Sequence, residues 1–306
     1  MPIFSSFLPY DIRPHGNEEV KVINCGNVIE LQSSQFHSKG SQIRKLNADE
    51  YFDIRTGEVK NFEHQEKRLD DTKSLKRSFA DARRIINANI TDPAKCRFIT
   101  LTYAENMRNE KKLYNDFQNF WKRKIRPTYP NTEYIIAAEP QARGAWHLHM
   151  LLLFPDEAPF IQNEQLAKMW GHGFVSVRAI DKVDNIGAYL VAYLADIPVE
   201  EYTDIQNIRA SAIVTKEHID DDGNLIPKKV VKGARLSLYP VGMHVFRWSS
   251  GIQKPQQYYT TADRAQTLVG DLQPCYEATK TITDTESGFT NIINYRQFNK
   301  KRKETP

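Results

Sequence analysis

The chain has few cysteines and no long hydrophobic run, and both absences narrow the class of protein it can be. Its three cysteines, Cys25, Cys96 and Cys275, stand far apart and form no CxxC pair. This spacing argues against a disulfide framework or a cysteine zinc site and fits a reducing compartment. No run of about 18 apolar residues is present, and the first residues lack the charged-then-apolar pattern of a secretion signal. We therefore expect a cytoplasmic protein that does not contact a membrane.

The sequence also contains no GxxxxGK[ST] motif, the phosphate-binding loop on which nucleotide-driven motor proteins depend. The net charge is only +4, so the balance of charges permits nucleic-acid binding without requiring it. Hydrophobic residues make up 40% of the 306 residues, which is enough to bury one sizeable core and a smaller second unit.

The middle of the chain is strongly patterned and its two ends are less regular. Leu75, Phe79 and Ile86 stand at helical spacing within residues 67–89. The letters DDGN at 221–224 are a turn signal, and they predict a surface hairpin or insertion. We predict four segments: a β-rich or irregular region at 1–64, a core at 65–210, a strand-rich extension at 211–295 and a basic tail at 296–306.

The core can be divided into elements by composition and periodicity. Strands are predicted at 97–105, 132–140, 145–154 and 174–180, and helices at 110–126, 163–171 and 184–197. The last helix is expected to begin at an Asp N-cap, Asp184. The order β-α-β-β-α-β-α predicts an α+β fold of the split βαβ, ferredoxin-like type. It has a central antiparallel sheet, flanking helices and additions at both ends.

The run RGAWHLHMLLLF places two histidines at the start of a strand. His147 and His149 share one face, because alternate side chains of a strand point the same way. A hairpin centred near Arg143 would bring Glu139 directly opposite His147. Two imidazoles and a carboxylate predict a divalent-metal site for Mg²⁺ or Mn²⁺ with open positions. The alternative is a pair of core histidines that hydrogen-bond to the backbone or to Glu139.

The helix at 184–197 carries two tyrosines four residues apart. Tyr189 and Tyr193 therefore share a helix face, where they could simply be packing residues. Beside a metal, however, a phenol can attack a phosphodiester and form a 5′-phosphotyrosyl link. A 3′-hydroxyl can later reverse that link, and a second tyrosine would allow a second cut.

Three stretches together resemble the motifs of a known family: FITLTYAENM, EPQARGAWHLHMLLLF and DNIGAYLVAYLAD. They resemble the HUH endonucleases, specifically the rolling-circle replication initiator (Rep) proteins of bacterial plasmids and single-stranded DNA phages. The resemblance spans about residues 97–197 and implies an HUH endonuclease core. It implies that His147, His149 and Glu139 are the metal ligands and that Tyr189 and Tyr193 are catalytic. The first motif, Thr100 to Tyr103, is given no chemical step.

One position departs from the family pattern. The family often has a lysine three residues after the nucleophilic tyrosine, but Ala192 and Asp196 stand at those positions here. Lys182, Arg178 or Lys232 could supply the missing positive charge at the scissile phosphate. The identity of the first nucleophile stays open, with a slight preference for Tyr189.

Contacts to DNA are predicted from charge and aromatic residues. Arg143 and Trp146, at the tip of the ligand hairpin, could stack on an unpaired base, although the tryptophan could instead cap the sheet. Lys182 is a further candidate. A basic face that could track phosphates, or merely be solvated, follows the first strand and comprises Lys111, Lys112, Lys122, Arg123, Lys124 and Arg126.

The sequence thus predicts a metal-dependent endonuclease and strand transferase that nicks single-stranded origin DNA through a tyrosine and later rejoins it. Host helicase and DNA polymerase would be its partners. Two alternatives remain: a transposase or relaxase of the HUH type with the same chemistry, and a non-cleaving DNA-binding or copy-control protein. The missing lysine favours the second alternative.

Overall fold

The structure is a computed structural model that describes residues 3–7, 13–36, 43–47, 49–62, 72–141, 144–202, 212–219, 225–284 and 288–302. The chain forms two compact units. One comprises residues 1–24, 28–66 and 256–306, and the other comprises 25–27 and 67–255. The predicted division at 64, 210 and 295 stays a prediction. Among the described residues, none of the helices has the length and hydropathy that a bilayer-spanning segment needs.

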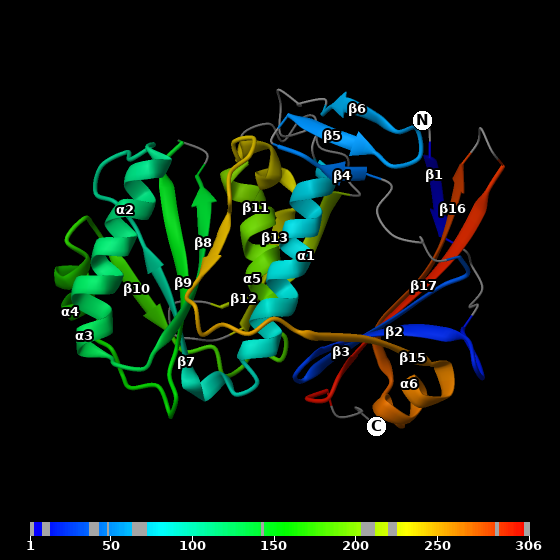
Figure 1. The fold of residues 1–306 in the computed structure, drawn as a ribbon. Helices are drawn as coiled ribbons and strands as arrows, with labels where there is room; N and C mark the ends of the chain where they lie inside the picture. Colours follow the sequence, from blue (N-terminus) through cyan, green and yellow to red (C-terminus); the bar gives the residue numbers. More distant parts are fainter. Residues whose placement is uncertain are drawn as a thin grey trace. The chain divides into compact units, whose positions relative to one another are not determined.

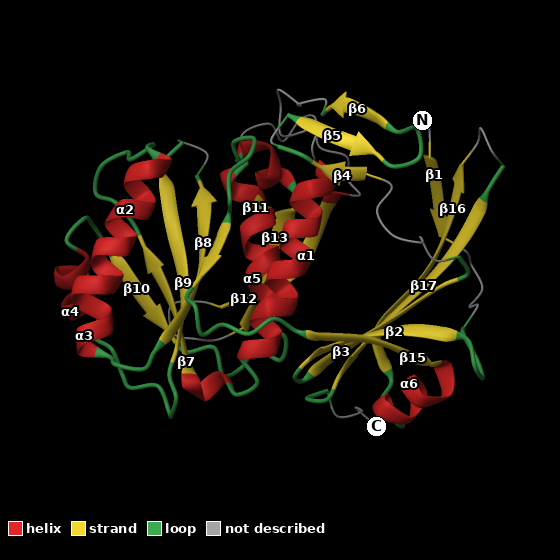
Figure 2. Cartoon of the chain, viewed as in Figure 1, coloured by secondary structure: helices red, strands yellow, loops and turns green. Residues whose placement is uncertain are grey.

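The first unit is built on a twisted sheet, whose strands Figure 2 shows in yellow. In spatial order its strands are β1 (Ile3–Phe7), β16 (Pro274–Asp284), β17 (Thr290–Asn299), β3 (Val28–Ser34), β2 (Glu19–Cys25) and β15 (Gln256–Thr261). Helix α6 (Ala262–Val269) packs on this sheet through Ala265 and Val269, against Val20 and Phe298. Because Phe298 is buried there, β17 runs to Asn299, past the predicted start of the basic tail.

A small separate sheet also belongs to the first unit. Its strands are β4 (Ile43–Lys45), β5 (Glu50–Asp53) and β6 (Glu58–Asn61). They pair in that order, each antiparallel to the next.

The second unit contains the predicted core, and its element order is the predicted one. Its sheet has the spatial order β10 (Val175–Arg178), β7 (Cys96–Leu101), β9 (Trp146–Leu153), β8 (Glu133–Pro140) and β14 (Phe246–Trp248). Every neighbouring pair is antiparallel. Figure 1 shows helices α2 (Glu110–Phe120), α3 (Arg126–Thr128) and α4 (Asn163–Trp170) on one side of this sheet. On the other side lie α1 (Thr72–Asn89) and α5 (Ile186–Ala195).

Successive side chains of a strand point to opposite faces, so the two faces of this sheet carry different sets of residues. Tyr134 on β8 lies on the α2 side, where its ring centroid is 4.9 Å from that of Phe117. Residues one position away point to the opposite face. There Phe98 of β7 stacks on His149 and lies edge-on to Tyr189. The histidines therefore face the tyrosine helix, whereas Leu148, Met150 and Leu152 point to the α2 side and are buried there.

Helix α5 begins at Asn185 rather than at the predicted Asp184. The Asn185 side chain accepts a hydrogen bond from the Ala188 backbone N–H at 2.9 Å, while Asp184 is exposed. Asn185 also accepts a bond from the side chain of Asn87 on α1. Asparagine and aspartate cap helices about equally well, so the bond from α1 selects Asn185 as the cap.

We expect Gly187→Ala to destabilise the second unit. A Cβ at this position would collide with the backbone carbonyl of Arg83 on α1, and the Gly187 N–H donates to the Asn87 side chain at 2.9 Å. Backbone cannot move aside as a flexible side chain can, so overpacking should cost about 1–3 kcal/mol. Urea denaturation measures the loss. An unchanged free energy of unfolding would show that α1 and α5 do not cross this closely.

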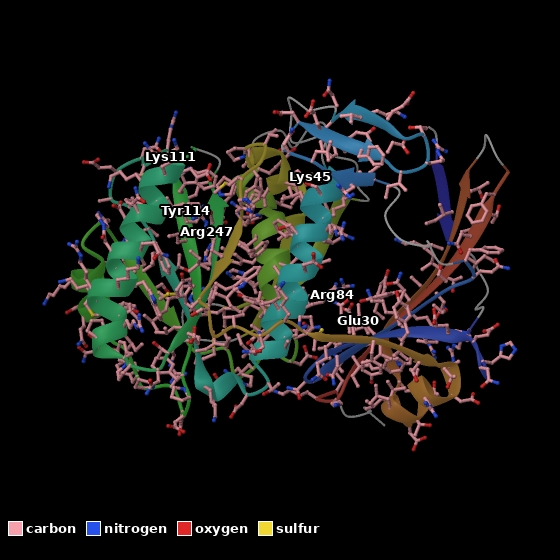
Figure 3. The ribbon with its side chains drawn as sticks, viewed as in Figure 1. Glu30, Lys45, Arg84, Lys111, Tyr114 and Arg247 are labelled. Carbon is pink, nitrogen blue, oxygen red and sulfur yellow. The ribbon has the colours of Figure 1, made fainter. Side chains whose placement is uncertain are left out.

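The two strands of the hairpin predicted around DDGN are present. Strands β12 (Ile213–Ile219) and β13 (Leu225–Val231) pair antiparallel, and β11 (Ile197–Pro198), just after α5, pairs with β13. The turn itself lies outside the described residues. The following segment returns to the main sheet as β14, whose Arg247 lies beside Tyr114 of α2 (Figure 3). The guanidinium carbon of Arg247 is 3.4 Å from the centroid of the Tyr114 ring.

Candidate functional site

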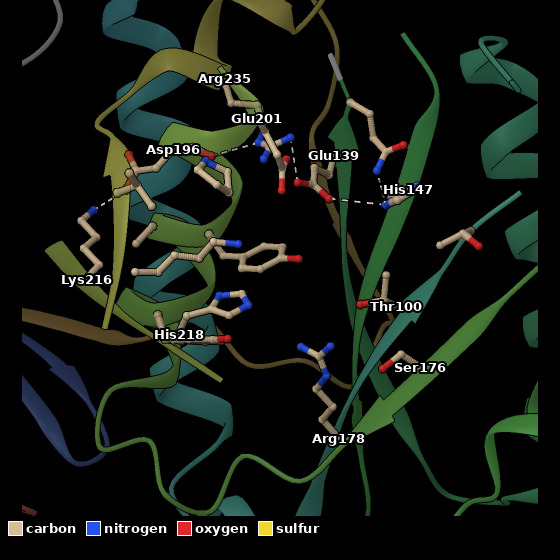
Figure 4. A pocket seen from close by; sticks show the side chains of 18 of the residues that line it. Thr100, Glu139, His147, Ser176, Arg178, Asp196, Glu201, Lys216, His218 and Arg235 are labelled. Atoms are coloured by element: carbon tan, nitrogen blue, oxygen red, sulfur yellow. Dashed lines mark hydrogen bonds and ion pairs between the residues drawn. The ribbon is translucent and has the colours of Figure 1, made fainter. Parts of the chain in front are cut away.

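The histidine strand, the tyrosine helix and the β12–β13 hairpin surround one cavity of about 370 Å³ in the second unit. Figure 4 shows side chains from these elements pointing into it. Glu139 and His147 line it from β8 and β9, and Tyr189 and Tyr193 from α5. The strand pair and the helix that the sequence singled out thus share a single hollow.

Glu139 and the two histidines come together as the strand register predicts. Glu139 lies directly opposite His147 in the β8–β9 ladder. Its Oε2 is 2.6 Å from Nε2 of His149 and 3.8 Å from Nδ1 of His147. Glu139 and His149 are both buried, whereas His147 is partly open to the cavity.

Arg235 holds the other oxygen of this carboxylate, at 2.8 Å from Oε1. It is buried and also donates to the backbone carbonyls of Pro140 and Asp196, at 3.0 and 3.2 Å. Burial by itself raises the pKa of Glu139, but the positive charges of His149, Arg235 and His147 outweigh it and leave the pKa below its usual value. Glu139 is therefore ionised at neutral pH.

Each histidine has a further polar neighbour. Thr100, which belongs to the first motif and lies on β7, is opposite His149 of β9. The Thr100 hydroxyl oxygen is 3.1 Å from Nδ1 of His149. The Gln141 amide nitrogen is 3.0 Å from Nδ1 of His147. Such partners fix the orientation and tautomer of a metal-binding imidazole. Thr100 can serve either tautomer of His149, because a hydroxyl both donates and accepts hydrogen bonds.

As the side chains stand, no three His, Cys, Asp or Glu residues within the described ranges form a group ready to hold a metal ion. A direct hydrogen bond joins two of the three expected donors, Glu139 and His149, to each other. The donor set itself, two imidazoles and an ionised carboxylate, fits a divalent first-row ion. Binding one would require this hydrogen bond to open.

The two tyrosines face the same cluster from α5. The Tyr193 ring lies edge-on to His149, with centroids 4.9 Å apart, and stacks on His218 of β12 at 5.4 Å. Tyr189 lies one turn earlier on α5, and its ring centroid is 6.4 Å from that of Tyr193. Burial, and then the charge of Glu139, raise the pKa of the Tyr193 phenol well above its usual value. Ionising Tyr193 is correspondingly costly.

Three residues were considered as replacements for the positive charge of the missing lysine, and they differ in whether they line the cavity. Arg178 of β10 lines the cavity, and Lys182 and Lys232 are not among its lining residues. Ala192 and Asp196, which stand where the family often has a lysine, also line the cavity. The Asp196 carboxylate forms an ion pair with Lys216 of β12.

The predicted DNA contacts that the structure describes are not among the residues that line this cavity. Trp146 is buried, with 5% of its surface exposed, and its indole N–H donates to the Arg108 carbonyl at 3.0 Å. This packing opposes the prediction that Trp146 stacks on a base and agrees with the alternative that it caps the sheet. Arg143 lies outside the described residues. The remaining predicted contacts are all exposed, namely Lys111, Lys112, Lys122, Arg123, Lys124, Arg126 and Lys182.

Sequence reasoning missed Arg235 and the side chains of the β12–β13 hairpin. Lys216 and His218 both line the cavity from β12, and Lys228 does so from β13. The spacing of Lys216 and His218 was a usable signal, because alternate residues of a strand share a face. Arg235 follows Gly233, whose φ of 73° turns the chain back toward β8, and nothing local in the sequence indicates its burial.

Comparison with protein families gives one match that covers this site. Residues 96–197 match the family described as replication-associated protein ORF2/G2P. The matched third of the chain contains Glu139, both histidines and both tyrosines. Comparisons with curated proteins and with solved structures gave no match. Over this segment the chain is similar to replication-associated proteins.

Proposed function

We propose that the protein is a rolling-circle replication initiator of the HUH type that nicks single-stranded origin DNA through a tyrosine. One observation carries the proposal: the two tyrosines of α5 share a single cavity with an ionised Glu139 and His147, and the Tyr193 ring contacts His149. The sheet supports it, because the third core strand, β9, lies between the first, β7, and the second, β8. A strand that lies between the two strands of a βαβ unit is typical of the split βαβ arrangement.

Glu139, His147 and His149 are the residues that would hold the metal. A bound Mg²⁺ or Mn²⁺ would polarise an oxygen of the scissile phosphate. The phenol oxygen of Tyr189 gives up its proton and forms a bond to phosphorus. The bond to the 3′ oxygen breaks, and that oxygen takes up a proton. The product is a 5′-phosphotyrosyl link on the protein and a free 3′-hydroxyl.

Rejoining is the reverse of the same step. Attack of a 3′-hydroxyl on the phosphotyrosine restores the phosphodiester and frees the tyrosine. With Tyr193 on the same helix face, one protein could cut a second time before release. We propose that host helicase and DNA polymerase unwind and copy the strand in the cytoplasm, because the sequence carries no Walker motif of its own.

The proposal predicts cleavage that needs both the metal and its ligands. Labelled single-stranded fragments that tile the protein's own replicon should be cut in Mn²⁺ and not in EDTA. Glu139→Gln and His147→Ala should each slow cutting by more than the roughly 10- to 100-fold that loss of an outer partner costs. His244→Ala is the matched control, since His244 is exposed and does not line the cavity.

Two outcomes would replace the proposal. Fragments that bind without being cut in any metal would favour a non-cleaving DNA-binding or copy-control protein, for which the Glu139–His149 bond is then structural. Cutting confined to sequences other than the replication origin would favour a transposase or relaxase with the same chemistry.

A further inference from the structure

A row of cavity-lining side chains starts just before β10 and continues along it, and of this row only Arg178 was considered above, as a source of positive charge at the scissile phosphate. Ser176 and Arg178 of β10 and Phe174, the residue before the strand, stand at alternate positions, and all three line the cavity. Figure 4 shows Ser176 and Arg178 pointing into it from the same strand. In the described part of the sheet β10 is an edge strand, paired with β7 alone. The row therefore combines an aromatic ring, a hydroxyl and a guanidinium on one accessible face.

Phe174 is exposed and yet firmly held. The Phe174 side chain borders the cavity, and 67% of its surface is exposed. Its carbonyl accepts hydrogen bonds from the backbone N–H and the hydroxyl of Thr102, at 3.0 and 2.8 Å. A Cβ on the preceding Gly173 would collide with the backbone at Thr102 and Ala104. The first motif thus fixes the backbone that presents this ring to solvent.

Arg178 lies at the other end of the row, beside the tyrosines. It is opposite Phe98 in the β10–β7 ladder, and the Phe98 ring lies 6.4 Å from that of Tyr189 and 6.3 Å from that of Tyr193. Alternate residues of a strand are roughly 6.5 to 7 Å apart. Phe174 is therefore two such steps, roughly 13 to 14 Å, from Arg178.

We propose that Phe174, Ser176 and Arg178 form a track for single-stranded DNA, in which an unpaired base stacks on Phe174 and a backbone phosphate binds Arg178 beside the tyrosines. Aromatic platforms and cations along a groove are how proteins bind single strands without reading sequence. That the strand is DNA rests on the proposed function, while the track itself does not require cleavage.

Binding of a labelled oligothymidylate to the full chain in EDTA tests the track without any cutting. Phe174→Ala should raise the Kd by roughly 5- to 100-fold, the range spanned by base–aromatic stacking, and Phe174→Trp should restore it. Phe160→Ala is the matched control, because Phe160 is 85% exposed and does not line the cavity. Arg178→Gln should also weaken binding and flatten its salt dependence, while Lys168→Gln on α4 should do neither.

A second probe separates stacking from any other effect of Phe174. On an oligomer with abasic sites, Phe174→Ala should cost little, because no base is present to stack. The track is wrong if Phe174→Ala binds oligothymidylate as well as Phe160→Ala does, or if its penalty is equal on the abasic probe. Weaker binding by Phe174→Ala in a protein that never cuts DNA would support the track and reject only the proposed nicking.

Discussion

Replacing Tyr189 with phenylalanine is expected to remove the first covalent protein–DNA adduct, lowering its rate of formation by roughly 10³-fold or more. The ring would remain in place against Phe98, so only the attacking oxygen is lost. Tyr193 is a poor substitute, because burial and the nearby Glu139 charge raise the pKa of its phenol. Adduct formation on labelled single-stranded origin DNA, resolved on a denaturing gel, measures the effect.

Tyr193→Phe is the matched comparison, since it removes one phenol oxygen from the same helix face. This variant should still form the first adduct and rejoin it with a 3′-hydroxyl, and it should fail to make the second cut. The opposite pattern, with the adduct lost in Tyr193→Phe and kept in Tyr189→Phe, would exchange the two roles. An adduct that survives in the double variant would exclude both tyrosines as nucleophiles.

Arg235→Met is expected to cost about 3–5 kcal/mol of folding stability, the range found when one partner of a buried ion pair is removed. Glu139 would keep a buried charge without the guanidinium 2.8 Å away, and the carbonyls of Pro140 and Asp196 would lose their donor. Methionine fills a similar apolar volume, so loss of packing contributes little. Urea denaturation followed by circular dichroism provides the measurement.

Lys112→Met is the control for this comparison. Lys112 pairs with Asp116 at 2.6 Å, but its side chain is about half exposed, so the change should stay within about 1 kcal/mol. Equal losses in the two variants would contradict the account of Arg235 as the buried counter-ion of Glu139. A second test of that role is Glu139→Gln combined with Arg235→Met, which should be less destabilising than the sum of the single changes.

The part of the site that depends on local pattern could be predicted from the sequence. Glu139 lies opposite His147 because a short turn fixes hairpin register, and Gly144 takes the positive φ of 82° that this turn needs. Tyr189 and Tyr193 share a face because helical spacing requires it. In each case the residues are close in sequence, and the geometry of one element relates them.

Contacts between distant segments could not be predicted in this way. Arg235 reaches Glu139 only because the chain returns after β13, and His218 stacks on Tyr193 only because β13 pairs with β11. Trp146 carries no sign that its ring is packed inward with the Arg108 carbonyl as partner. These outcomes depend on tertiary packing, which overrides what a single segment prefers.

The most direct measurement is to map the covalent adduct by mass spectrometry after incubation with single-stranded origin DNA in Mn²⁺ or in EDTA. The account predicts a nucleotide attached to Tyr189 in the peptide from α5, formed in Mn²⁺, absent in EDTA and absent from His147→Ala. Origin DNA that binds tightly but leaves every tyrosine of that peptide unmodified in Mn²⁺ would contradict it.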